Sequence, residues 1–319
     1  MATDTDVNST IPHFKCMALI GVGLIGSSIA LAAKRANLVD RIVGCARTER
    51  TREKALELGL VDAMFEDAGE TVAGADLVII CSHLGSYPSV GKAISGNLLP
   101  GTIVTDVGSV KGCVARDLGP HIPQEVHLVP GHPVSGSEKS GPEAGFETLF
   151  DGRWWILTPD DDADQDVVRT LAAFVGALGS QVEIMDAERH DLVLAITSHL
   201  PHLIAYNIVG TADDMETVTQ GEVVKFSAGG FRDFTRIAAS DPEFWRDVFL
   251  NNKDAVLETL GRFTEDLIAL QRAIRWGQGD NLLRLFSNSR DIRQRIIRAG
   301  QDTDAPNFGR PEDSGSDAE

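Results

Sequence analysis

Apolar and polar positions follow different patterns in the two halves of the chain. In the first half, short apolar runs alternate with segments that have a helical pattern. The predicted strands cover residues 16–20, 41–45, 77–81, 102–106, 154–157 and 182–185, and the predicted helices cover residues 27–35, 52–58 and 167–178. A continuous apolar run such as 77–81 is typical of a strand buried on both faces. The alternation predicts an α/β Rossmann-type domain, with a mostly parallel sheet covered by helices on both faces.

After Asp186 the strand pattern does not return. Residues 187–211, 244–270 and 280–299 carry apolar side chains at three- and four-residue spacing, which predicts helices. We therefore expect a Rossmann-type domain over residues 13–185 and an all-α domain over residues 186–300. The long apolar stripes of this helical domain favour a homodimer that forms through it. Residues 301–319 are polar and acidic, which predicts a disordered tail.

Composition and charge limit which partners and which cellular location are expected, but they do not indicate a reaction. The formal net charge of −18 argues against nucleic acid or an anionic membrane as a partner, but a local basic site for an anionic substrate stays open. The first twelve residues lack the features of a secretion signal, and no apolar run approaches the roughly 20 residues that span a bilayer. The four cysteines are scattered without a CxxC motif. This usage is typical of reduced thiols, so we expect a cytoplasmic protein.

A glycine-rich turn follows the first predicted strand. Gly21, Gly23 and Gly26 form a GxGxxG pattern that encloses Leu24 and Ile25 and opens a predicted helix. The first glycine permits a tight turn, the second lets the backbone approach a pyrophosphate, and the third allows close helix–strand packing. A chance match and a flavin site are the alternatives. The second strand arrives about twenty residues later, however, and this context favours a nicotinamide dinucleotide.

The end of the second predicted strand bears on which dinucleotide binds. An Asp or Glu at this place binds the adenosine ribose of NAD. This chain has Ala46 there, followed by Arg47 and Thr48, and a guanidinium can pair with a 2′-phosphate. The sequence therefore favours NADP and leaves NAD open, with a solvated loop charge as the alternative for Arg47. Arg47, Thr48 and Ser82, which follows the strand over 77–81, complete the predicted cofactor site.

Five further segments carry a resemblance to a known family. They are DVGSVK at 106–111, GHPVSGSEKSG at 131–141, SHLPH at 198–202, GGFRDFTRIA at 229–238 and SDPEFWR at 240–246. In this order and spacing they resemble the prephenate/arogenate (cyclohexadienyl) dehydrogenase family of tyrosine biosynthesis. The resemblance implies an oxidative decarboxylation with NAD(P). Hydride leaves C4 of a cyclohexadienyl ring, CO2 leaves C1, and the aromatic product is 4-hydroxyphenylpyruvate or tyrosine.

The resemblance also implies roles for individual residues. His132 matches the catalytic histidine, which accepts the proton of the C4 hydroxyl. Ser109 is expected to bind that hydroxyl and to help orient His132. Arg236 matches the arginine that binds a substrate carboxylate, for which a guanidinium has the right fork geometry. The remaining predicted substrate contacts are Ser137, Glu138, His199, His202 and Trp245.

Purely structural roles stay open for these residues. A histidine before a proline suits a loop, Ser109 suits a helix N-cap, and Arg236 suits a salt bridge. Trp245 is as compatible with the core as with the substrate site, and Glu138 with a solvated surface.

His199 and His202 lie three residues apart, hence on one helix face, which a helix interface would also explain. A metal site is disfavoured because no Cys or carboxylate motif accompanies them. For the whole chain, the alternatives are a non-catalytic NADP(H) sensor and a Rossmann dehydrogenase of the β-hydroxyacid or imine-reducing kind. The sequence does not distinguish prephenate from arogenate.

Overall fold

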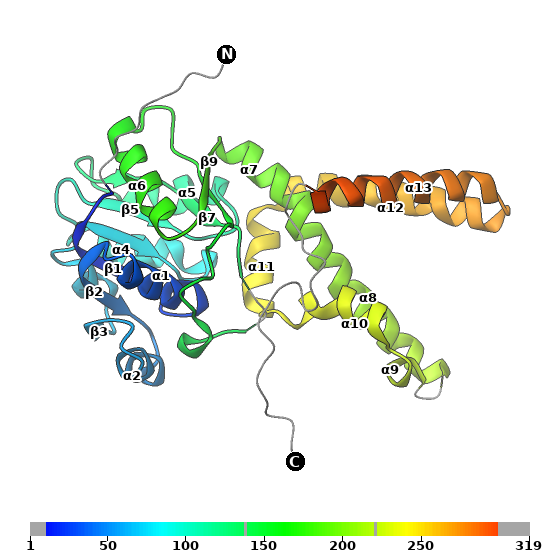
Figure 1. The fold of residues 1–319 in the computed structure, drawn as a ribbon, viewed down its shortest axis with the longest axis horizontal. Coiled ribbons are helices and arrows are strands. Elements are labelled where there is room, and N and C mark those ends of the chain that lie inside the picture. The colour runs from blue at the N-terminus through cyan, green and yellow to red at the C-terminus, as the bar shows by residue number, and fades with distance from the viewer. Residues whose placement is uncertain (1–10, 137–138, 220–221, 299–319) are drawn as a thin grey trace. The chain divides into compact units, whose positions relative to one another are not determined.

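Two compact units make up the structure, a computed structural model that describes residues 11–136, 139–219 and 222–298 (Figure 1). The first unit is Met1–Thr259 and the second is Leu260–Glu319. The division expected near residue 185, between a Rossmann-type and a helical domain, stays a prediction. The tail expected over residues 301–319 lies outside the described residues.

Six strands form the main sheet of the first unit. They are β1 (Phe14–Ile20), β2 (Val39–Cys45), β3 (Ala63–Phe65), β4 (Leu77–Ile80), β5 (Ile103–Asp106) and β6 (His127–Leu128). Their order is β3-β2-β1-β4-β5-β6, and every neighbouring pair is parallel. The chain moves outward in one direction from β1 and in the other from β4. At such a reversal, the carboxyl ends of the strands leave a place where α/β sheets bind ligands.

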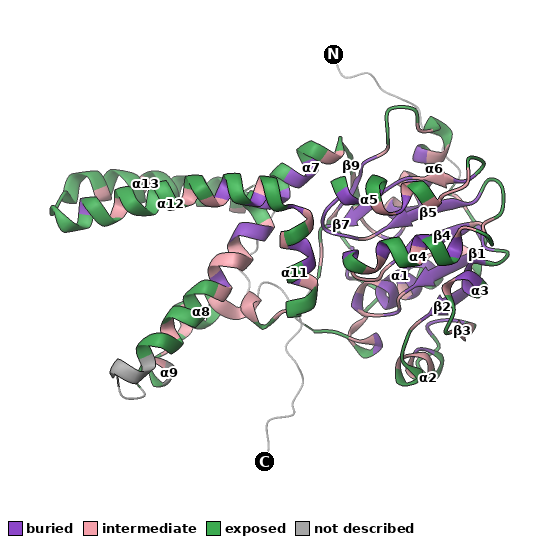
Figure 2. Ribbon diagram, turned by 180° about the vertical axis from the view of Figure 1, so that it is seen from behind, coloured by how far each residue is buried: buried purple, intermediate pink, exposed green. Residues whose placement is uncertain are grey.

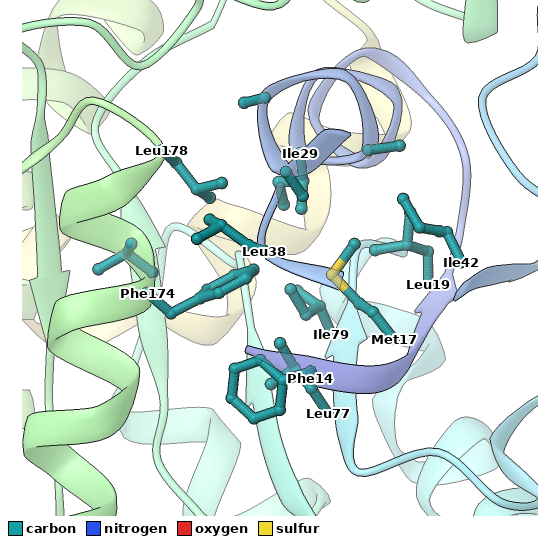
Figure 3. Packing of buried hydrophobic residues seen from close by; sticks show 14 of the residues in the cluster. Phe14, Met17, Leu19, Ile29, Leu38, Ile42, Leu77, Ile79, Phe174 and Leu178 are labelled. Carbon is teal, nitrogen blue, oxygen red and sulfur yellow. The ribbon is translucent and has the colours of Figure 1, made fainter. Parts of the chain in front are cut away.

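Alternate residues of the central strands face two separate cores. The helices around the sheet are α1 (Leu24–Arg35), α2 (Glu49–Glu57), α3 (Ala68–Val72), α4 (Tyr87–Ile94), α5 (Gly112–Asp117) and α6 (Gln165–Ala177). Met17 of β1 packs with Ile29 of α1 and Phe174 of α6 (Figure 3). The next residue, Ala18, belongs to the core that α3, α4 and α5 cover. The sheet therefore has helices on both faces, and the predicted fold class is confirmed.

The last predicted strands lie in a second sheet instead of extending the first. β7 (Gly131–Pro133) pairs antiparallel with β8 (Trp154–Leu157), which pairs parallel with β9 (Gln181–Ile184). The sequence does not predict β7, because three residues are too few for an apolar period to be visible. This strand carries His132, which lies opposite Ile156. The histidine is therefore held on a strand and not in a loop.

The second half of the chain is helical, as predicted. Its elements are α7 (Ala187–Leu194), a π-helical segment (Ala195–His199), α8 (Leu200–Thr219), α9 (Glu222–Lys225), α10 (Gly229–Thr235), α11 (Pro242–Asn251), α12 (Lys253–Arg275) and α13 (Gly279–Ile296). Short 3₁₀ turns cover Leu84–Ser86, Gly119–His121, Pro142–Ala144 and Arg236–Ala239.

The prediction of one continuous helix over residues 244–270 is wrong at Asn252. α11 ends at Asn251 and α12 begins at Lys253, and the residue between them has φ −105° and ψ 34°. The side-chain amide of Asn252 donates to the Asp191 carbonyl oxygen at 2.8 Å and lies 3.0 Å from His199 Nδ1. Because these bonds reach residues far away in the sequence, the local apolar period gives no sign of the break.

The stretch Ala187–Met215, which contains α7 and most of α8, is long and apolar enough to cross a membrane by length and composition alone. No unbroken apolar run of that length exists in the sequence, so the stretch was not expected to qualify. It carries His190, Asp191 and His199, which are buried and hydrogen-bonded within the first unit. Buried polar groups that are paired in this way are typical of the interior of a folded protein.

In the second unit, α13 runs beside the part of α12 that begins at Leu260 (Figures 1 and 2). Most of their residues are exposed (Figure 2). The large exposed apolar side chains on these helices are Leu267, Ile268, Ile274, Leu283, Leu285, Phe286, Ile292 and Ile296, with Trp276 in the turn between the helices. Exposed apolar side chains in such number are typical of a surface that contacts another protein.

Candidate active site

The turn after β1 has the geometry that a dinucleotide pyrophosphate requires. Gly21 has φ +106°, and a Cβ on Gly26 would lie 2.3 Å from the Gly21 carbonyl oxygen. Glycine is therefore needed at both positions, the first for its backbone conformation and the second for close helix packing. A Cβ on Gly23, by contrast, would meet no atom within 4 Å. The open space beside Gly23 fits the approach of a phosphate.

The first turn of α1 is suited to an anion. Gly23 is the N-cap and forms no side-chain cap bond, and the first turn contains no acidic residue. Leu24 is buried and Ile25 packs against the core beneath the turn. Backbone N–H groups and the positive end of the helix dipole favour a phosphate at such a place. The residues present therefore fit the pyrophosphate of NAD(P).

Two neighbouring strand ends hold the other predicted cofactor residues. Ser82 follows β4 beside the turn, since a Cβ on Gly21 would lie 3.1 Å from the Ser82 nitrogen. Thr48 is the N-cap of α2 and accepts a hydrogen bond from the Thr51 N–H at 3.2 Å. Arg47 is exposed, and its carbonyl oxygen accepts a hydrogen bond from Arg52 at 3.0 Å. The backbone after β2 is thus fixed, while the Arg47 side chain reaches solvent.

A buried ion pair connects the loop after β5 to β7. Lys111 Nζ donates to Asp106 Oδ2 at 2.5 Å and to the Gly131 carbonyl oxygen at 2.6 Å, and both charged side chains are 0% exposed. The Asp106 carboxylate accepts further hydrogen bonds from Tyr87 OH, Gly108 N and Gly131 N. Buried charges are tolerated when they are paired and hydrogen-bonded in this way. The pair fixes the loop of Ser109 relative to the strand of His132.

The imidazole of His132 is part of a chain of buried polar groups. Its Nδ1 lies 2.8 Å from His190 Nε2, and His190 Nδ1 lies 2.8 Å from Asp191 Oδ1. Asp191 also accepts hydrogen bonds from the backbone N–H groups of Lys111 at 2.7 Å and Gly112 at 2.8 Å. The carboxylate is therefore anchored from two sides, and both histidines are held by it in turn.

Burial keeps these histidines neutral. It lowers the pKa of His132 well below its ordinary value of 6.5, and the nearby His190, Lys111 and His199 lower it further. Burial also lowers the pKa of His190, although the hydrogen bond to Asp191 opposes the shift. A neutral imidazole has one unprotonated nitrogen that can accept a proton. His132 Nδ1 is engaged with His190, which leaves Nε2 for a substrate.

His199 and His202 both contact the indole ring of Trp245. Trp245 is 6% exposed, stacks on His202 with ring centroids 3.6 Å apart, and meets His199 edge-on at 6.1 Å. Burial lowers the pKa of each histidine to about 4. The two imidazoles thus meet at one indole ring, although His199 ends the π-helical segment and His202 lies in α8. Trp245 is a member of the core that covers one face of the main sheet, so its structural role is established.

Arg236 lies at the start of the 3₁₀ turn after α10, near His202. Its charge is close enough to His202 to contribute to the lowered pKa of that imidazole. Arg232, four residues earlier, is exposed and donates to Asp233 Oδ1 at 3.1 Å. The fold thus brings Arg236 near His202 and leaves Arg232 at the surface.

Ser109 lies in the loop between β5 and α5 and is 7% exposed. Its hydroxyl forms no hydrogen bond with any residue that the structure describes. The N-cap of α5 is Lys111, so Ser109 does not cap that helix. A buried hydroxyl with its bonding capacity unused fits a site for a polar ligand. Ser137 and Glu138 lie outside the described residues, and within the described ranges no group of three or more His, Cys, Asp or Glu side chains could hold a metal.

Two family models match the chain. They are "Prephenate dehydrogenase, nucleotide-binding domain" over residues 29–184 and "Prephenate dehydrogenase, dimerization domain" over residues 186–288. The cyclohexadienyl dehydrogenase of Zymomonas mobilis is 40% identical over 281 residues, which is 88% of this chain and 95% of that protein. The chain belongs to the prephenate dehydrogenase family.

Solved structures agree with this family. The prephenate dehydrogenase of A. aeolicus, in complex with hydroxyphenyl propionate and NAD+, has a TM-score of 0.82 and 33% identity, covering 88% of this chain and 98% of that one. The arogenate dehydrogenase of Synechocystis has a TM-score of 0.73 and 26% identity, and the match covers 88% of this chain and 99% of that one. The resemblance drawn from the motifs is confirmed, and the protein is an NAD(P)-dependent dehydrogenase. A non-catalytic sensor and another class of Rossmann dehydrogenase are set aside.

The structure adds residues to the site that the sequence analysis did not select. Asp106 and Lys111 lie at the two ends of the DVGSVK segment, but the ion pair between them depends on the fold. His190 and Asp191 lie at the start of the helical half, and Asn252 lies in the break between α11 and α12. The sequence signal was a His-Asp pair directly before the apolar run Leu192–Leu194, where buried polar groups need partners.

Proposed function

We propose that this protein oxidises and decarboxylates prephenate, arogenate or both, and produces 4-hydroxyphenylpyruvate or tyrosine. The observation that carries the proposal is His132, a buried neutral imidazole whose Nδ1 is bonded to His190. Its remaining nitrogen is unprotonated at neutral pH and can accept a proton from a substrate. Membership of the family connects that base to a cyclohexadienyl substrate.

The chain's own residues place the substrate and move one proton. His132 Nε2 takes the proton of the C4 hydroxyl, and the electron pair of that O–H bond forms the C4=O bond as the hydride leaves. A bound NAD(P)+ supplies the hydride acceptor. Loss of CO2 from C1 then completes an aromatic phenol once the C4 oxygen regains a proton. Because aromatisation drives the reaction, correct placement of the ring matters more than additional catalytic groups.

Arg236 is our proposed partner of a substrate carboxylate. A guanidinium–carboxylate pair fixes orientation as well as affinity, and the position near His202 supports the assignment. Ser109 is proposed to bind the C4 hydroxyl through its buried Oγ. Further proposed contacts are His199, His202 and Trp245, together with Ser137 and Glu138, which lie outside the described residues.

NADP is the cofactor that we propose the enzyme prefers. Support comes from Ala46 in place of an acidic residue at the end of β2 and from the exposed side chain of Arg47 beside it. Replacing Ala46→Asp and Arg47→Ile together should raise kcat/KM for NAD relative to NADP by about tenfold or more, since one charge-assisted contact is worth about 1.5–3 kcal/mol. A wild-type kcat/KM that is higher with NAD than with NADP would contradict the proposal.

The assembly and location of the enzyme are also proposals. The exposed apolar side chains of α12 and α13 support a homodimer that forms through the helical half. The scattered free cysteines support the cytoplasm as its location.

One assay tests the activity directly. Purified protein is mixed with prephenate or arogenate and with NAD+ or NADP+, and reduced dinucleotide is followed by its absorbance while products are separated by chromatography. We expect stoichiometric reduced dinucleotide and 4-hydroxyphenylpyruvate or tyrosine with at least one substrate. The proposal fails if neither substrate is turned over by protein that binds the dinucleotide.

A further inference from the structure

His190 occupies a place that calls for an explanation. It is 0% exposed, lies on α7 and makes two hydrogen-bond contacts, one with His132 and one with Asp191. An apolar side chain would fill the same space at a lower cost of desolvation. A buried imidazole between a proposed base and a carboxylate therefore points to control of the base.

The Asp191 carboxylate determines which atom donates in each hydrogen bond between Asp191, His190 and His132. Both oxygens of Asp191 accept backbone N–H groups, from Lys111 at 2.7 Å and from Gly112 at 2.8 Å, and a carboxylate has no proton to donate. His190 Nδ1, 2.8 Å from Asp191 Oδ1, must therefore be the donor. A neutral imidazole has one N–H group only, so His190 Nε2 is an acceptor.

The same reasoning then fixes His132. Since His190 Nε2 accepts, His132 Nδ1 must donate across the 2.8 Å contact. In a neutral imidazole this leaves Nε2 unprotonated, with its lone pair available. The hydrogen bond made by one ring nitrogen determines the state of the other. The chain Asp191–His190–His132 thus selects one of the two tautomers of His132.

We propose that His190 and Asp191 are positioning residues that hold His132 in the tautomer whose Nε2 can accept the substrate's proton. The proposal rests on the function proposed above. When Nε2–H forms and the substrate O–H bond breaks, His132 becomes an imidazolium that still donates through Nδ1 to His190. The negative charge of Asp191, one imidazole further along, stabilises that cation without moving a second proton. Neither residue touches the substrate.

The backbone partners of Asp191 link the hydrogen-bonded side chains Asp191, His190 and His132 to the rest of the site. Lys111 and Gly112 lie at the start of α5, directly after the loop of Ser109. The Asp191 carbonyl oxygen accepts from Asn252, whose amide also pairs with His199. The carboxylate therefore has a fixed position relative to both sides of the site, which tautomer control requires.

Two substitutions of similar size separate positioning from packing. His190→Gln keeps a side-chain acceptor within reach of His132 Nδ1, and His190→Leu does not. We expect His190→Leu to lower kcat by about 10²–10⁴, because loss of the correct tautomer in the serine-protease triad costs about 10⁴. We expect His190→Gln to recover at least about tenfold of that loss. KM for substrate and Kd for dinucleotide should stay within about threefold in both variants. Equal kcat in the two variants, or a parallel loss of binding and of Tm, would mean that His190 only fills space.

A spectroscopic measurement on the unmodified enzyme tests the tautomer without activity. In protein labelled with ¹⁵N-histidine, long-range ¹H–¹⁵N correlation spectra distinguish protonated from unprotonated ring nitrogens, and His132→Asn identifies the signals of His132. We expect His132 to be protonated at Nδ1 only. Protonation at Nε2 would overturn the inference even if the enzyme turns over. Conversely, an enzyme inactive on both substrates would refute the proposed function and leave the tautomer result standing.

Discussion

The glycine turn after β1 and the polar cluster around His132 are built by opposite means. The turn lies within residues 21–26, and its shape depends on backbone conformation and on side chains that are missing. The cluster joins β7, α7, the π-helical segment Ala195–His199 and the junction of α11 with α12, and His132 and His190 are 58 residues apart in the chain. It depends on side chains that are present and correctly paired. Local spacing specifies the first region, whereas the tertiary fold specifies the second.

The two regions should therefore respond differently to substitution. Changes in the cluster should alter catalysis while the cofactor still binds. Changes in the turn should alter the binding of the cofactor in proportion to the space that a new side chain occupies.

The largest effect is expected from the proposed base. His132→Asn removes the imidazole and should lower kcat at least about a hundredfold, within the 10²–10⁴ that a positioned base contributes. Kd for the dinucleotide should be nearly unchanged, as fluorescence titration would measure. His127→Asn, on β6 away from the cluster, is the matched control and should keep kcat within about twofold. Near-normal kcat in His132→Asn would return this histidine to a structural role.

A smaller effect is expected from the proposed carboxylate partner. Arg236→Gln should raise KM for the substrate about 10–150-fold, because a lost charge-assisted hydrogen bond costs about 1.5–3 kcal/mol. Arg236→Lys should also suffer, since an ammonium lacks the planar fork. Arg232→Gln is the control, because that side chain is exposed and pairs with Asp233. If only the Arg232 variant weakens binding of the substrate, the assignment within this segment is wrong.

The contrast between the regions also explains what the sequence could predict. The turn, the parallel strands and the fold class follow from local patterns, since apolar periods and glycine spacing are local properties. His132, Ser109 and Arg236 could be named from motifs, but their partners could not. No local pattern indicates that His132 meets His190, that Lys111 pairs with Asp106, or that Asn252 interrupts a helix. Those contacts exist only once distant segments have packed.

Within the turn, Gly23 and Gly26 differ in the space that surrounds them, so the same substitution to alanine should affect stability differently at the two positions. Gly26→Ala would place its Cβ 2.3 Å from the Gly21 carbonyl oxygen, and such overpacking typically costs about 1–3 kcal/mol of stability. Gly23→Ala meets no protein atom within 4 Å and should leave Tm within about 2 °C. Both variants should weaken binding of the dinucleotide. If Gly23→Ala binds the dinucleotide as the wild type does, no phosphate approaches this residue and the predicted contact is wrong.

The smallest effect at neutral pH, and the one that grows as pH falls, concerns the buried histidines. The pKa of His202 is lowered from 6.5 to about 4 in the folded protein, mainly by burial. Between these values the unfolded chain binds more protons than the folded one. The contribution of neutral His202 to the free energy of unfolding is therefore fully present above pH 6.5 and is lost as pH falls towards 4. His202→Phe keeps an aromatic ring against Trp245 and removes this titration. Urea unfolding should then show a pH slope that is shallower than that of the wild type by at most about 1.4 kcal/mol per pH unit. Above pH 7 the two proteins should have parallel curves. Identical slopes between pH 4 and 6.5 would mean that His202 titrates normally in the folded state. The surroundings of His202 would then be wetter, and closer to those of the half-buried glycine turn, than the geometry indicates.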